Sequence, residues 1–65
     1  MWGVFTDVTD GLRVSLDLDR IVSIAELPDA TTYIQVETNS KNESINVKES
    51  FDEVMKMIAA NEVQI

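Results

Sequence analysis

The chain contains no cysteine and no histidine among its 65 residues. Disulfide bonds, zinc sites built from Cys and His, iron–sulfur clusters, thiolate nucleophiles and histidine-dependent triads are therefore excluded together. With one proline and two glycines, the sequence also has no flexible or Pro-rich stretch that would separate two domains. We therefore expect residues 1–65 to form a single small domain.

Basic side chains are scarce as well. Five Lys and Arg residues stand against 12 Asp and Glu residues, which gives a formal net charge of −7 at pH 7. Nucleic acids and anionic membranes are bound mainly by Lys and Arg, and the five basic residues here form no cluster. We therefore expect no nucleic acid among its partners. The absence of a long apolar run or of a targeting segment predicts a cytoplasmic protein with no membrane insertion.

A regular alternation of apolar and polar residues is what the sequence does contain. Hydrophobic residues make up 45% of the chain, which is enough for a core. Between residues 12 and 18 every second residue is a leucine or a valine, as in a strand with one buried and one exposed face. The same pattern recurs between turn-forming segments. It predicts strands over residues 2–8, 12–18, 21–26, 31–38 and 43–48.

The periodicity changes at Ser50, where Ser-Phe-Asp-Glu forms a capping box. In such a box the Ser50 hydroxyl accepts from the Glu53 amide, and the Glu53 carboxylate reaches back to the Ser50 amide. Apolar residues then follow at helical spacing, which predicts a helix over residues 50–60 with Asn61 as its cap. The alternating residues 61–65 could add a short strand.

Together these elements predict an α+β domain. An antiparallel β-sheet of four or five strands is expected to be covered on one face by the C-terminal helix. The expected core consists of Val14, Leu16, Ile21, Ile24, Ile34, Val36, Ile45, Val47, Val54 and Ile58.

Carboxylates are the only abundant groups that could bind a metal or act in catalysis. Asp17 and Asp19 would share one face of a strand, and Asp7 and Asp10 flank a turn, so either pair could hold a cation weakly. Aspartates at such positions more commonly serve as turn residues and caps. Ser50 has no histidine as a base, and its capping role accounts for it. We therefore predict no catalytic residue, no metal site, no cofactor and no enzymatic activity.

Self-association is expected from the small size and the apolar ends of the chain. A small domain without disulfide bonds or metal has little stability to spare, and an open sheet has two edges that need cover. The first strand and the tail carry apolar side chains with no basic or proline residue to discourage pairing. We therefore predict a homodimer or a higher oligomer. The candidate interaction residues are Trp2, Phe5, Tyr33, Val63 and Ile65.

Three blocks of sequence carry a family resemblance that spans nearly the whole chain. They are Val-Thr-Asp-Gly at 8–11 followed by Asp17 and by Asp-Arg-Ile at 19–21, Ile-Ala-Glu-Leu-Pro-Asp at 24–29, and Val-Lys-Glu-Ser-Phe-Asp-Glu-Val at 47–54 followed by Ile58. With these blocks the chain resembles the FlbD family of short bacterial proteins, also called the swarming motility protein SwrD family. It departs from the family pattern at Ala25, which stands where the family places a Glu directly after the Ile.

The resemblance implies a non-catalytic accessory protein that acts through protein–protein interaction. In flagellated bacteria this family is linked to flagellar motor power and swarming. The alternative belongs to a different class: an oligomeric protein that binds a small ligand such as a nucleotide and acts as a sponge, for example one encoded by a phage. A nucleotide sponge needs basic side chains that converge on phosphates, and the candidates are Arg13, Arg20 and Lys48.

Overall fold

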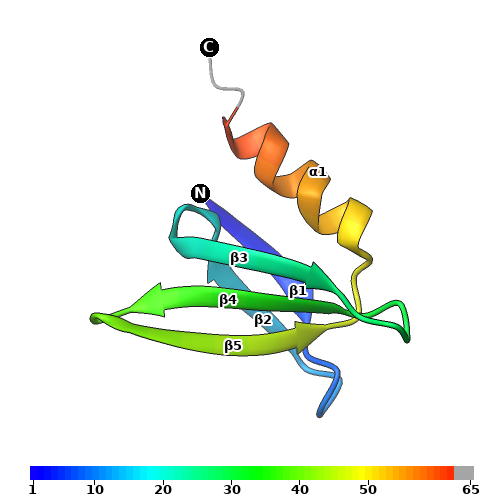
Figure 1. The fold of residues 1–65 in the computed structure, drawn as a ribbon. Helices are drawn as coiled ribbons and strands as arrows, with labels where there is room; N and C mark the ends of the chain where they lie inside the picture. Colours follow the sequence, from blue (N-terminus) through cyan, green and yellow to red (C-terminus); the bar gives the residue numbers. More distant parts are fainter. Residues whose placement is uncertain (63–65) are drawn as a thin grey trace.

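The computed structural model describes the backbone of residues 1–62 and the side chains of residues 1–60. Five strands are followed by one helix, which confirms the predicted α+β class (Figure 1). In chain order the elements are β1 (Trp2–Thr6), β2 (Arg13–Asp17), the short 3-10 helix η1 (Leu18–Arg20), β3 (Ile21–Glu26), β4 (Thr32–Thr38), β5 (Lys41–Val47) and α1 (Phe51–Glu62).

The five strands form two antiparallel sheets, and in this respect the prediction of a single sheet is wrong. One sheet pairs β1 with β2, and the other has the order β3-β4-β5. The 3-10 helix η1 turns the chain between β2 and β3, so these neighbours in sequence do not pair. The sheets meet where Asp7 bridges Val47 and the Lys48 N–H donates to the Thr6 carbonyl at 2.9 Å. The strands therefore follow the order β3-β4-β5-β1-β2 around the core.

The core lies between the two sheets and one face of α1. Its buried members are Phe5, Leu18, Ile34, Val36, Val47 and Val54. Four of these are among the predicted core residues, whereas Phe5 and Leu18 are not. The six other predicted members, Val14, Leu16, Ile21, Ile24, Ile45 and Ile58, are partly buried and pack against this cluster.

Strand β1 shows how the core is filled. Gly3 and Phe5 face inward and are buried, whereas Trp2 and Val4 face outward and are exposed. A Cβ atom at Gly3 would lie 2.9 Å from Leu18 Cδ2 and 3.1 Å from Phe5 Cε2. Two buried side chains thus occupy the space that any other residue at position 3 would need.

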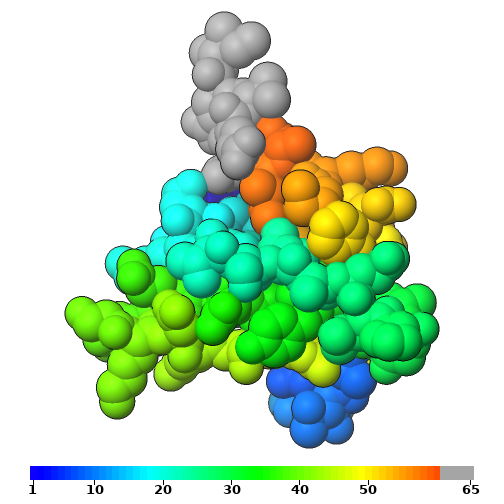
Figure 2. All heavy atoms as spheres, viewed as in Figure 1, coloured from blue at the N-terminus to red at the C-terminus, as the bar shows by residue number. Residues whose placement is uncertain are grey.

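Helix α1 lies against β3 and η1. Figures 1 and 2 show the helix above β3. The Ser50 Oγ accepts from the Glu53 N–H at 3.2 Å, as predicted for the capping box. The return contact differs from the prediction, because the Ser50 hydroxyl itself donates to Glu53 Oε1 at 3.4 Å. The helix continues to Glu62, so Asn61 is not its cap and residues 61 and 62 are not a strand. Residues 63–65 lie outside the described residues.

Glu49, just before α1, connects three elements. Its Oε1 accepts from the Thr6 N–H at 2.8 Å and its Oε2 from the Thr6 hydroxyl at 3.0 Å. Its backbone carbonyl accepts from the hydroxyl of Thr32 at 2.7 Å, and Thr32 is fully buried in β4. One residue therefore holds the end of β1, the start of β4 and the entry to the helix together.

Four aspartates form turns through their own side chains. Each accepts a hydrogen bond from the backbone N–H two residues later, in the pairs Asp7–Thr9, Asp10–Leu12, Asp17–Asp19 and Asp29–Thr31. This geometry matches the turn and capping roles expected for the acidic residues. At the β4–β5 hairpin, Asn39 and Ser40 both have positive φ, as a two-residue hairpin turn of type I′ requires.

The turn at Asp29 gives a measurable pH effect. The Thr31 hydroxyl and the Thr31 N–H both donate to the Asp29 carboxylate, which lowers the pKa of Asp29 from its ordinary value of 3.8. A lowered folded-state pKa stabilises the fold above pH 3.8, and this contribution is lost as the pH falls through the folded-state pKa. Carboxyl NMR titration should show that Thr31→Val raises the pKa of Asp29 part of the way towards 3.8, because the N–H bond remains. Thr38→Val, at the far end of β4, should leave it unchanged; an equal shift in both variants would contradict the assignment.

Candidate interaction edge

Strand β2 is the outer strand of the two-stranded sheet, and its backbone directions follow from the register. Hydrogen bonds from Asp7 N to Leu12 O and from Leu18 N to Met1 O, at 2.8 and 2.9 Å, lie at either end of the β1–β2 ladder. Because hydrogen-bonded pairs alternate along an antiparallel ladder, the even-numbered residues of β2 direct their N–H and C=O groups towards β1. The odd-numbered residues Arg13, Ser15 and Asp17 direct theirs away from β1.

Among the described residues, this edge of β2 is unpaired. Within residues 1–62 no strand hydrogen-bonds to it, and the backbone N–H groups of Arg13, Ser15 and Asp17 have no hydrogen-bond partner there. The edge of the other sheet is different, because β3 has a register shift between Ile21 and Ser23 and lies against α1. Bulges and covering helices protect sheet edges from pairing, so β2 is the less protected of the two.

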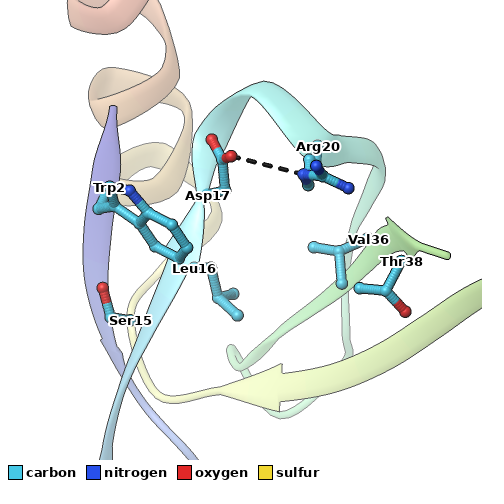
Figure 3. Close-up of a pocket in the computed structure, with 7 residues that line it drawn as sticks. All are labelled: Trp2, Ser15, Leu16, Asp17, Arg20, Val36 and Thr38. Carbon is cyan, nitrogen blue, oxygen red and sulfur yellow. Dashed lines mark ion pairs between the residues drawn. The ribbon is translucent and has the colours of Figure 1, made fainter.

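A pocket of about 160 Å³ lies beside the free edge of β2 and is lined by residues of β1, β2, η1 and β4. Trp2, Leu16 and Val36 provide its apolar wall. The remaining lining residues are Ser15, Asp17, Arg20 and Thr38. Figure 3 shows Leu16 and Val36 pointing into the space between β2 and β4. Trp2 is 66% exposed, although it is the largest side chain of the pocket.

Asp17 forms two ion pairs at the rim of this pocket, one with Arg20 and one, at 4.0 Å from its Oδ1, with the N-terminal ammonium of Met1. Arg20 Nε is 3.6 Å from Asp17 Oδ2 (Figure 3). Asp17 Oδ1 also accepts from the Asp19 N–H at 3.1 Å. The Arg20 side chain is 60% exposed, so the pair contributes little to stability, on the order of 0–1 kcal/mol. Its effect is to hold one basic and one acidic group at the rim of an apolar pocket.

A second, shallower groove of about 290 Å³ runs between β3 and α1. Val22 and Met55 are its most exposed apolar side chains.

Among the described residues, no group of three or more acidic side chains could hold a metal ion. In the same part of the chain no helix is long and apolar enough to cross a membrane.

The structure separates the predicted interaction residues. Trp2 lies at the pocket beside β2, in an exposed position. Phe5 is fully buried in the core, so its assignment as an interaction residue is wrong: it faces inward on the same side of β1 as Gly3. Tyr33 is half-buried on β4, opposite Ala25 and Asn46, and does not line the pocket.

Val63 and Ile65, the two remaining candidates, lie outside the described residues. Ser15, Leu16 and Thr38 line the pocket with Trp2 but were not predicted as site residues, and Arg20 was predicted only as a candidate for phosphate binding. The alternating pattern predicted the strand that carries Ser15 and Leu16. It contains no signal for which strand lies at an edge.

Comparison of the chain with protein-family models, with curated proteins and with solved structures finds no match.

Proposed function

We propose that this protein is a non-catalytic protein-interaction module that binds an extended segment of a partner along the free edge of β2. The observation that carries the proposal is the unpaired backbone edge at Arg13, Ser15 and Asp17 beside the apolar pocket. The resemblance to the FlbD family supports the same class of function, because that family is expected to act through contacts with other proteins.

The geometry suits strand addition. An added strand would satisfy the free backbone groups of β2, and its alternate side chains would point towards the pocket. A volume of about 160 Å³ is smaller than the roughly 300–1,000 Å³ of most small-molecule sites. It is better suited to one apolar side chain of a bound strand, which would contact Trp2, Leu16 and Val36.

The alternative, a nucleotide sponge, receives less support from the charges. Phosphate binding requires basic groups that are free to converge on the ligand. Arg20, the basic residue at the pocket, is already paired with Asp17, and Asp19 directly precedes it in the chain. We expect nucleotides to leave the fluorescence of Trp2 unchanged, since any ligand of this pocket would contact that side chain.

Selection from a library of random extended peptides tests the proposal. Selected peptides should shift the emission of Trp2, the only tryptophan of the chain, to shorter wavelength. Ser15→Pro should weaken their binding about tenfold or more, because it removes the central free N–H of the edge. Since this N–H points away from β1, proline is tolerated there, and circular dichroism should show an intact fold.

Ser15→Ala is the matched control, because it keeps the N–H and removes only the hydroxyl. It should bind the selected peptides as well as the original chain does. Peptides that bind all three proteins equally, or that protect backbone amides of β3 rather than of β2 in hydrogen exchange, would contradict the proposal.

A further inference from the structure

We infer that the extended segment bound by β2 is β2 of a second copy of this chain, in an antiparallel pair centred on Ser15. This inference rests on the proposed function and specifies its partner. It also moves the predicted self-association from the N-terminal strand to β2. Strand β1 already pairs with β2 on one side and meets β5 on the other at Asp7 and Val47.

The backbone of β2 is self-complementary in this register. An antiparallel pair centred on Ser15 places the outward N–H of Ser15 opposite the outward carbonyl of Ser15 in the second copy. It also places the N–H of Asp17 opposite the carbonyl of Arg13 in the second copy, and the two-fold axis repeats this contact. All five residues of β2 are then matched along the strand.

The side chains are complementary in the same register. Arg13 and Asp17 lie on the outer face of the sheet, where their cross-strand neighbours are Thr6 and Trp2. Across the two-fold axis Arg13 of each copy lies opposite Asp17 of the other, so opposite charges meet twice. On the inner face Val14 lies opposite Leu16 of the second copy. Val14 and Leu16 are only partly buried in the single chain, so this pairing would cover apolar surface.

Neighbouring registers lack this match. The free N–H and C=O groups of β2 belong to its odd-numbered residues, so odd-numbered residues of one copy must face odd-numbered residues of the other. The two-fold axis can therefore pass only through a residue, and other registers move it by one or more whole residues. A centre at Arg13 places the two arginines opposite each other, and a centre at Asp17 places the two aspartates opposite each other; like charges directly opposite are destabilising. Centres at Val14 or Leu16 leave Arg13 without Asp17 opposite it. Ser15 is the centre that pairs both charges.

Sedimentation velocity at physiological ionic strength, up to about 1 mM protein, tests the inference. The original chain should shift from a mass of 7.3 kDa towards twice that mass. Arg13→Glu should raise the dissociation constant about tenfold or more, because two attractive pairs become repulsive. Lys41→Glu changes the net charge equally at the exposed β4–β5 hairpin and should leave the dissociation constant nearly unchanged. Equal effects of the two variants would overturn the inference.

Cysteine cross-linking tests the register directly, because the chain has no cysteine of its own. Directly opposed residues of a hydrogen-bonded pair have Cα atoms about 5.5 Å apart, which a disulfide bond can span. Ser15→Cys should therefore form a disulfide-linked dimer on mild oxidation. Ser23→Cys, the matched variant at the other edge in β3, should remain monomeric under the same conditions. A cross-link at Ser23 without one at Ser15 would place the interface on β3 and overturn the inference.

The failure of this inference can be distinguished from failure of the proposed function. A chain that stays monomeric at all concentrations, while selected peptides still bind and depend on the Ser15 N–H, overturns the second copy as partner and leaves strand addition at β2 intact. A chain that neither dimerises through β2 nor binds peptides there overturns both.

Discussion

Glu49→Ala is expected to lower the free energy of unfolding by about 2–3 kcal/mol. The variant removes a partly buried carboxylate that accepts two hydrogen bonds from Thr6, and hydrogen bonds to charged groups contribute roughly 1.5–3 kcal/mol each. The two bonds share one partner residue, so their contributions do not add fully. A domain of this length is expected to have only roughly 3–10 kcal/mol of total stability. The loss would therefore be a large part of the whole.

Urea denaturation followed by Trp2 fluorescence measures this loss. Glu49→Gln should lie between Ala and the original chain, because its amide oxygen still accepts one of the two bonds. Glu43→Ala, at an exposed position of β5, removes the same charge and should change stability by less than about 0.5 kcal/mol. If Glu49→Ala and Glu43→Ala had the same small effect, the connection between β1 and the start of α1 would not contribute to stability.

Gly3→Val is expected to cost about 2–3 kcal/mol, the upper range for overpacking a well-filled core. The Cβ alone would lie 2.9 Å from Leu18 Cδ2, and the two methyl groups of valine would extend into the same space. Gly3→Ala should cost less, because Leu18 Cδ2 is the end of a flexible side chain and can turn away. Alanine also loses less backbone entropy on folding than glycine does.

A double variant separates this steric cause from a general effect of valine in a strand. Leu18→Ala opens the space that a valine at position 3 would need, so combining it with Gly3→Val should cost less than the sum of the two single changes. Ser44→Val introduces the same residue at an exposed position of β5 and should be nearly neutral, since valine is favoured in strands. Additive losses in the double variant would show that Gly3 is not needed for the packing of Leu18.

The core and the candidate site were predictable only in part, and Leu18 and Phe5 show why. The alternation through Leu12, Val14 and Leu16 predicts a strand that continues to Leu18. In the structure Leu18 belongs to η1, because Asp17 accepts from the Asp19 N–H and caps a helical turn at that point. Alternation likewise places Trp2 and Phe5 on opposite faces of the first strand, but it does not say which face points inward.

What the sequence by itself determined was local. Alternation over residues 12–18 and 31–38 specified strands, and the spacing of Ser50 and Glu53 specified the start of α1, because these signals act between residues close along the chain. The tertiary structure alone decided the division into two sheets, the burial of Phe5 against Gly3 and Leu18, and the free edge of β2. These features depend on contacts between residues far apart in sequence, such as Thr6 with Glu49, and no periodic pattern records which distant segments meet.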